Sequence, residues 1–281
     1  MTSPEFYDRE YNARAAIPNA TEIFADWRLR ATQAQSELPG LKNLSYGSSP
    51  QENLDLFWCL TPDRPLFVFI HGGYWRSLHK DDFSWIAAPY LKEGINVAIV
   101  NYDLVPHIDL TTQVRQVYSA IAWLYDHAEA LDFSPDKIFV GGHSAGGHLT
   151  ALMLCAQWPK IRADLPVNLV KGGIALSGLF DLGPIAEAPF LNVDLKLSPD
   201  DVQKLSPINM PPSHRANLIL TVGALESSEF HRQSDLLESA WQGKLSITRL
   251  DAPGHNHLTV CNALAEANHP LFQANVALME R

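Results

Sequence analysis

KIFVGGHSAGGHLTALML, residues 137–154, is the stretch most indicative of the fold class, because it leads from a strand through a tight bend into a helix. The apolar run before Gly142 is typical of a buried strand, and apolar residues after position 145 recur at the helical spacings of three and four. The bend between them reads Gly142-His143-Ser144-Ala145-Gly146, a GxSxG motif in the strand–turn–helix context that gives the motif meaning. This context predicts that Ser144 is a nucleophile.

A serine at such a bend requires small neighbours, because its backbone angles are strained and the strand and helix approach closely. Gly142 and Gly146 leave that room, and Gly147 lets the helix lie against the sheet. The hydroxyl of Ser144 is then exposed at a helix N-terminus, where free N–H groups favour developing negative charge. A pentapeptide of this kind also arises by chance, so the prediction depends on the flanking strand and helix.

Short apolar runs alternate with longer amphipathic segments along the rest of the chain. The runs predict strands at 54–60, 66–70, 96–101, 137–142, 172–178, 218–223 and 245–250. Helical patterns occupy 113–131, the residues after 145, 227–242 and 262–280. Strands that alternate with helices predict an α/β protein with a mostly parallel sheet covered by helices on both faces.

Two segments depart from this alternation. Residues 181–212 are rich in proline and acidic residues with weak periodicity, which favours a small cap-like insertion above the sheet. The N-terminal segment, about 1–45, predicts a helix or two packed on the outside. We therefore expect one domain over residues 1–281.

Composition excludes several classes of protein. The chain has 281 residues, 46% of them hydrophobic and 19% charged, which is too apolar for disorder. Its formal net charge of −10 argues against nucleic acid or an anionic membrane as a partner. No signal peptide or transmembrane run is recognisable, so we expect a cytoplasmic protein that acts on a small molecule.

Cys59, Cys155 and Cys261 are far apart and form no metal or disulfide motif. The oligomeric state is open, with a homodimer as one option.

A second glycine motif directly follows a predicted strand. LFVFIHGGYWRS, residues 66–77, places two glycines after a buried run, where backbone N–H groups can face a site without side chains in the way. Attack by a serine puts negative charge on the carbonyl oxygen, which needs such donors. We therefore predict an oxyanion hole from the N–H groups of Gly72, Gly73 and Ala145, with His71 as a structural hydrogen-bonding residue. The alternative is a simple Gly-Gly turn.

The general base should follow the last strand, because GxSxG hydrolases carry the serine, the acid and the histidine in that order along the chain. PGHNHLT, residues 253–259, offers His255 and His257 at this position. A metal site is disfavoured, because no further ligands lie nearby and the two side chains point in different directions. The residues alone leave the choice between the two histidines open.

The orienting acid has several candidates. Glu226 lies three residues after the strand at 218–223, where the acid is expected, and we favour it. Asp181, after the preceding strand, is the main rival, whereas Asp251 is too close in sequence to the histidines. Glu229 is expected to be a capping or surface carboxylate.

Four motifs together resemble the kynurenine formamidase branch of the serine α/β-hydrolases: DREYNAR (8–14), HGGYWRS (71–77), GHSAGGHL (142–149) and VGALESSEFHRQS (222–234). A broader similarity is to esterases with an HGG oxyanion loop. The resemblance implies the α/β-hydrolase fold, Ser144 as nucleophile and His257 as base. The family usually has aspartate where this chain has Glu226, and a carboxylate is retained.

The resemblance also implies a reaction, the hydrolysis of N-formyl-L-kynurenine to L-kynurenine and formate through an acyl-enzyme, without metal or cofactor. The alternative is a broad carboxylesterase for short-chain or aryl esters. A hydrolase fold reduced to a receptor is disfavoured, because all three catalytic positions carry competent side chains. Tyr74, Trp75 and His255 are candidate pocket residues, and further apolar wall could come from Phe180, Phe190 and Leu191.

Overall fold

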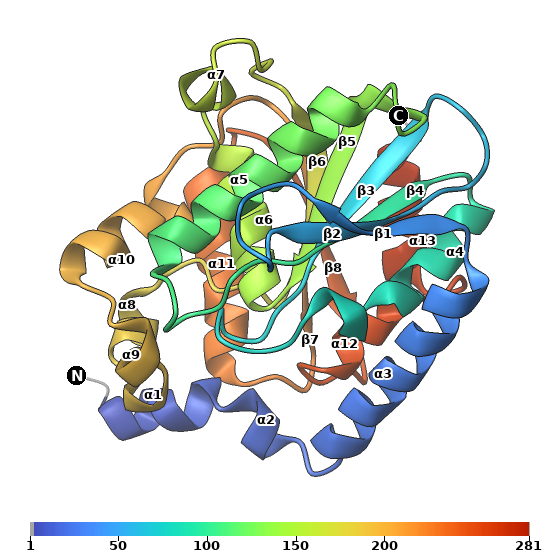
Figure 1. The fold of residues 1–281 in the computed structure, drawn as a ribbon. Coiled ribbons are helices and arrows are strands. Elements are labelled where there is room, and N and C mark those ends of the chain that lie inside the picture. The colour runs from blue at the N-terminus through green and yellow to red at the C-terminus, as the bar shows by residue number, and fades with distance from the viewer. Residues whose placement is uncertain (1–2, 281) are drawn as a thin grey trace.

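The computed structural model describes residues 3–280 and contains one eight-stranded sheet (Figure 1). Its strands are β1 (Gly40–Ser45), β2 (Asn53–Phe57), β3 (Arg64–Ile70), β4 (Asn96–Val100), β5 (Phe133–His143), β6 (Val170–Leu176), β7 (Asn217–Gly223) and β8 (Ser246–Ala252). The order across the sheet is β1-β2-β4-β3-β5-β6-β7-β8. β1 and β4 pair antiparallel with β2, and every other pair is parallel. The predicted α/β class with a mostly parallel sheet is confirmed.

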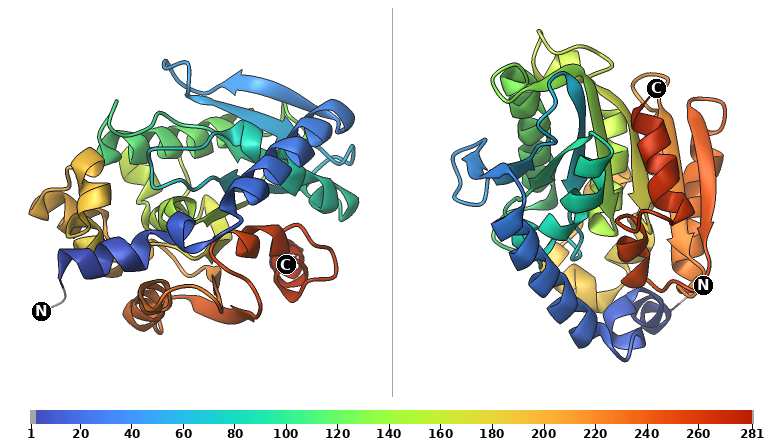
Figure 2. Two further views of the ribbon diagram at one scale, coloured as in Figure 1. Left: turned by 90° about the horizontal axis from the view of Figure 1, so that it is seen from below. Right: turned by 90° about the vertical axis from the view of Figure 1, so that its right-hand side faces the viewer.

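Helices cover both faces of this sheet (Figures 1 and 2). α5 (Leu110–His127), α6 (Ala145–Cys155) and α11 (Ser228–Trp241) lie on one face, and α4 (Ala87–Lys92), α12 (Thr259–Ala263) and α13 (Pro270–Met279) lie on the other. The remaining helices are α1 (Pro4–Tyr11), α2 (Ala13–Ala16), α3 (Ala20–Glu37), α7 (Trp158–Ile161), α8 (Gly183–Ala186), α9 (Pro189–Leu195) and α10 (Pro199–Leu205), with 3-10 turns η1 (Lys80–Asp82), η2 (Ser84–Ile86) and η3 (Pro207–Asn209). Within residues 3–280, no helix combines the length and apolarity needed to cross a membrane.

The central strands are apolar on both sides because they separate two cores. In β3, Leu66, Val68 and Ile70 pack into the core beneath α5 and α6. The alternate residues Phe67 and Phe69 pack into the opposite core, beside α4 and α13. This side-chain alternation explains why a strand buried on both faces reads as a continuous apolar run.

Two elements differ from the sequence prediction. β1 was not expected, because GLKNLS is mostly exposed and lies at the sheet edge with an irregular pairing to β2. The single helix expected at 262–280 is instead two helices, α12 and α13, separated by a turn. α13 begins at Pro270, and the side chain of His269 accepts a hydrogen bond from the N–H of Leu271 at this start.

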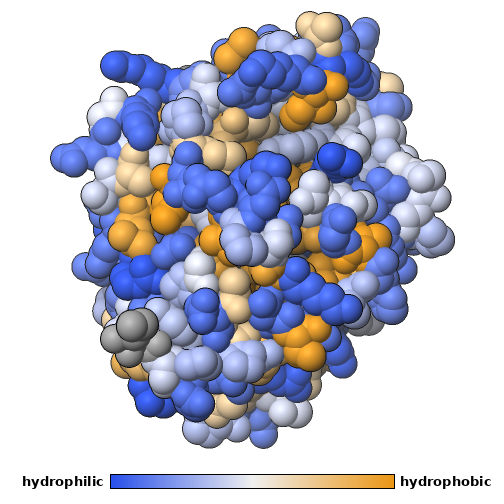
Figure 3. All heavy atoms as spheres, turned by 90° about the vertical axis from the view of Figure 1, so that its left-hand side faces the viewer, coloured by the Kyte–Doolittle hydropathy of each residue, from blue (hydrophilic) through white to orange (hydrophobic). Residues whose placement is uncertain are grey.

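The segment 181–212 forms three short helices and the turn η3, and α1 packs against it. α1 contacts α8, α9 and α11, and the N–H of Phe190 donates to Asp8 Oδ1 at 3.1 Å. On this side of the molecule, hydrophobic side chains form separate spots among hydrophilic ones (Figure 3). α1 is thus joined to the predicted cap segment, a contact that the sequence did not indicate.

Candidate active site

Ser144 lies at the bend between β5 and α6 with φ 58° and ψ −118°. Its N–H donates to the carbonyl of Leu176 at the end of β6, at 2.8 Å. The helix passes so close to β3 that a Cβ on Gly146 would lie 1.9 Å from the carbonyl oxygen of Ile70. Glycine is therefore required at this position by close packing, and the bend holds Ser144 in a left-handed conformation that is costly for a side-chain-bearing residue.

Glu226 and His257 form a buried pair at the neighbouring strand ends. His257 Nδ1 lies 2.6 Å from Glu226 Oε2, and the glutamate side chain is fully buried. The other carboxylate oxygen of Glu226 accepts hydrogen bonds from the N–H of Gly223, at 2.7 Å, and from the hydroxyl of Ser177. Because Nδ1 is held by the carboxylate, Nε2 is the ring nitrogen left to take a proton.

The rival acid and the rival histidine have other partners. Asp181 pairs with Arg232 at 3.3 Å and accepts the N–H of Gly183. His255 Nδ1 lies 3.0 Å from the carbonyl of Thr259. Its own carbonyl accepts the N–H of Leu225 at 3.0 Å, so the backbone of His255 supports the loop that carries Glu226.

His143, the variable residue of the GxSxG motif, positions the loop of His257. Its Nε2 donates to the carbonyl of His257 at 2.6 Å, and the two rings lie 4.6 Å apart. Burial, followed by the neighbouring imidazole, lowers the pKa of His143 well below its usual value. His143 is therefore neutral and adds no positive charge beside His257.

The HGGYW loop after β3 has an unusual backbone. Gly73, Tyr74 and Trp75 have φ values of 109°, 51° and 60°, three consecutive left-handed residues. A Cβ at Gly73 would lie 2.1 Å from the carbonyl oxygen of Ser77, so only glycine fits. A Cβ at Gly72 would lie 3.2 Å from Cβ of Ser144, which places the loop backbone directly beside the serine.

This loop is attached to the helix that follows Ser144. The indole N–H of Trp75 donates to His148 Nδ1 on α6 at 3.2 Å. The carbonyl of Trp75 accepts from the N–H of Val105 and from Gln113 Nε2, both at 2.9 Å. His71, at the start of the loop, contacts the carbonyl of Gly72 through Nδ1 at 2.8 Å, and burial lowers its pKa to about 4.

A cavity of about 390 Å³ opens onto these groups, lined by Gly73, Tyr74, His143, Ser144 and His257. Its remaining wall comes largely from the N-terminal helices, between residues 13 and 28. The expected pocket residues Trp75 and His255 lie outside this lining, because the Trp75 indole is fully buried against His148 and the His255 ring packs on His269.

The further apolar wall expected from Phe180, Phe190 and Leu191 is also absent from this lining. Phe180 and Leu191 are fully buried in the core. Phe190 packs edge-on against Tyr74, with ring centroids 6.0 Å apart. Of these three residues, Phe190 contacts the loop, and the N-terminal segment supplies the cavity wall instead.

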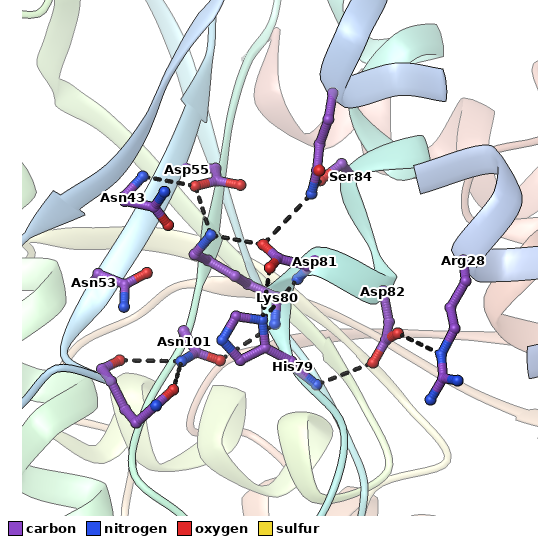
Figure 4. A network of polar contacts seen from close by, with 12 residues as sticks. Arg28, Asn43, Asn53, Asp55, His79, Lys80, Asp81, Asp82, Ser84 and Asn101 are labelled. Carbon is purple, nitrogen blue, oxygen red and sulfur yellow. Dashed lines mark hydrogen bonds and ion pairs between the residues drawn. The ribbon is translucent and has the colours of Figure 1, made fainter. Parts of the chain in front are cut away.

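A buried ion pair anchors the segment after the HGGYW loop (Figure 4). Lys80 Nζ lies 2.8 Å from Asp55 Oδ1 on β2, and both side chains are about 1% exposed. Next to it, Asp82 accepts the N–H of His79 and pairs with Arg28 of α3 at 3.1 Å. The same turn therefore fixes the loop to the sheet and holds the helix that forms the cavity wall.

Glu229 is neither a cap nor a surface residue. It is 6% exposed, accepts the hydroxyl of Tyr11 at 2.6 Å and pairs with Arg232 at 2.7 Å. The carbonyl of Tyr11 in turn accepts the hydroxyl of Tyr74. The DREYNAR segment thus reaches the HGGYW loop through Tyr11.

Ser177 and His143 were not predicted as positioning residues, and the N-terminal wall of the cavity was not predicted either. A signal for Ser177 and His143 was available, because each is a polar residue at or next to the carboxyl end of a buried strand. For the N-terminal wall, the available signal was the resemblance of the DREYNAR motif to the kynurenine formamidase branch.

The chain resembles known hydrolases in sequence and in structure. A family described as BD-FAE matches residues 55–168. The kynurenine formamidase of Salmo salar is 30% identical over 251 residues, which span 85% of this chain and 82% of the relative. A solved structure from Silicibacter sp. TM1040, provisionally described as a thioesterase, has a TM-score of 0.85 at 29% identity and covers 98% of both chains. Esterase B from Lactobacillus Rhamnosis shares the fold, with a TM-score of 0.71 at 19% identity over 92% of both chains. The chain therefore belongs to the kynurenine formamidase family and is a serine hydrolase with the α/β-hydrolase fold.

Proposed function

We propose that this enzyme hydrolyses N-formyl-L-kynurenine to L-kynurenine and formate through a formyl-enzyme on Ser144. The observation that carries the proposal is that His257, held by the buried Glu226, lines the same cavity as Ser144 in a chain of the kynurenine formamidase family.

In the first half-reaction, Ser144 Oγ attacks the formyl carbon while His257 Nε2 takes its proton. Glu226 keeps Nδ1 protonated and stabilises the imidazolium that forms. The negative charge on the carbonyl oxygen is stabilised by the N–H groups of Gly72, Gly73 and Ala145. When the C–N bond breaks, the imidazolium gives its proton to the leaving arylamine, and the formyl group stays on the serine.

In the second half-reaction, water attacks the formyl carbon and His257 takes its proton. The tetrahedral species collapses to formate, and the imidazolium returns the proton to Ser144. The neutral state of His143 favours both steps, because a second positive charge beside His257 would oppose the imidazolium.

The test is a comparison of kcat/KM for N-formyl-L-kynurenine and p-nitrophenyl acetate with the same protein. We expect the formamide to be the better substrate and Ser144→Ala to abolish its turnover. His257→Ala should also abolish it, whereas His255→Ala should retain most activity because that imidazole lies outside the cavity. A preference for the ester by orders of magnitude would replace the proposal with a broad carboxylesterase.

A further inference from the structure

The cavity beside Ser144 is locally cationic in a molecule whose formal net charge is −10. Arg14, in α2, and Arg28, in α3, both line it. Within residues 3–280, the lining contains no aspartate or glutamate. Such a cavity favours an anionic ligand, because the field is set by the nearest charges more than by the net charge.

The two arginines differ in what they already bind. Arg28 pairs with Asp82 at 3.1 Å, and Asp82 is itself held by the N–H of His79. The guanidinium of Arg14 has no carboxylate partner in the described part of the chain. It lies over the face of Phe24, 5.3 Å from the ring centroid, and Phe24 lines the same cavity. Arg14 is thus positioned at the cavity with its hydrogen-bonding groups available.

The chemistry of this wall fits one class of ligand. A guanidinium presents a planar fork that matches a carboxylate through two hydrogen bonds. Phe24, Trp27 and Tyr74 are among the lining residues, and aromatic residues beside the cavity suit an aryl group. We propose that Arg14 determines specificity by binding the carboxylate of an aryl formamide whose formyl group is attacked by Ser144. This inference rests on the proposed function and names the group that recognises the amino acid part of that substrate.

Loss of Arg14 should weaken substrate binding without slowing the chemical step. Arg14 would contact the carboxylate equally in the ground state and the transition state, so its loss should raise KM and leave kcat nearly unchanged. Because Arg14 is exposed, KM for a substrate that it binds through the carboxylate should also rise with ionic strength. A purely structural role for Arg14 would produce neither pattern.

The experiment pairs N-formyl-L-kynurenine with its carboxamide, which keeps the aryl formamide and the amino group but lacks the anion. We expect Arg14→Gln to lower kcat/KM for the acid by about 10- to 100-fold and for the carboxamide by less than about twofold. Arg14→Lys should fall between, because it keeps the charge without the fork. Arg9→Gln is the matched control, since Arg9 belongs to the same N-terminal motif but lies outside the cavity lining. An equal loss on both substrates, or no loss on either, would overturn the inference.

A binding measurement separates this inference from the proposed function. Calorimetry with Ser144→Ala protein would compare L-kynurenine with L-kynurenine carboxamide, and the same pair would be measured with Arg14→Gln added. Tighter binding of the acid that disappears in the double variant supports the inference even if neither formamide is cleaved, in which case only the proposed function fails. Equal binding of both ligands by the Ser144→Ala protein overturns the inference even if the formamide is hydrolysed.

Discussion

Replacing Glu226 tests the arrangement of the site most directly, because a single rival carboxylate provides a matched comparison. Glu226 is fully buried and 2.6 Å from His257 Nδ1. Asp181 follows the neighbouring strand but pairs with Arg232, and its side chain is 23% exposed. Glu226→Ala and Asp181→Ala therefore remove a carboxylate from two places, of which only the first contacts His257, the proposed base.

The expected losses of activity in the two variants differ by several orders of magnitude. Loss of the acid in a Ser-His-acid triad lowers kcat by about 10⁴, because the imidazole is no longer held in the correct tautomer. At about 1.4 kcal/mol for each factor of ten, this corresponds to about 5.5 kcal/mol of barrier. The partly exposed pair of Asp181 contributes at most about 1 kcal/mol to stability and nothing direct to the base. We expect Asp181→Ala to retain activity within about tenfold.

Stability must be measured beside activity, because Glu226 also accepts the N–H of Gly223 and the hydroxyl of Ser177. Leaving two buried donors unpaired costs about 1–3 kcal/mol each. Glu226→Gln keeps a carbonyl acceptor and should fold more stably than Glu226→Ala while remaining nearly inactive. Thermal unfolding and kcat/KM on the preferred substrate would be measured for all three variants. A larger loss from Asp181→Ala than from Glu226→Ala, with both proteins folded, would move the acid to the earlier strand.

Three further predictions concern residues that support the site. Burial lowers the pKa of His71 and of His148 to about 4 and that of His143 well below its usual value of about 6.5, so the unfolded state binds more protons below pH 7. Urea titrations should therefore show the free energy of unfolding falling by at least about 4 kcal/mol from pH 7 to pH 5, and a flat profile would contradict the burial argument. Lys80→Met leaves the charge of Asp55 buried and unpaired, so urea titration should show the free energy of unfolding reduced by about 3–5 kcal/mol. A reduction below about 1 kcal/mol would mean that water reaches the pair. Gly146→Ala places a Cβ 1.9 Å from the carbonyl oxygen of Ile70 in β3, so esterase and formamidase assays should both show near-complete loss of activity. Wild-type activity in this variant would contradict the close packing at the bend.

The central part of the fold could be predicted from the sequence because its strands are buried on both faces. β3 and β4 are continuous apolar runs with sharp boundaries, and the GxSxG bend fixes which strand precedes α6. β1 escaped prediction because an exposed edge strand has neither an apolar run nor a strict alternation. The turn that separates α12 from α13 carried a signal, Pro270, which was outweighed by the apolar pattern on both sides of it.

The supporting contacts of the site could not be predicted in the same way. Ser177 reaches Glu226 across 49 residues of sequence, and Tyr11 reaches Glu229 across 218. Nothing in the local pattern of either residue specifies its partner, because the partner is set by how the strands and helices pack in the tertiary fold. Glu229 looked like a surface carboxylate for this reason, since its burial depends on Tyr11 and on an arginine one helical turn away.

The strained residues of the site share a structural explanation. Tyr74, Trp75, Ser144 and Ser177 all have φ between 49° and 60°, and all follow the carboxyl ends of three adjacent parallel strands. Left-handed backbone at residues with side chains is costly and persists only where the surroundings determine it. The fixed contacts of Trp75 with α6 and of Ser144 with β6 supply that constraint. Each contact also joins one segment of the site to another, so the interactions that hold the strained loops are the ones that set the distance between Ser144, the proposed nucleophile, and the groups proposed to bind the oxyanion.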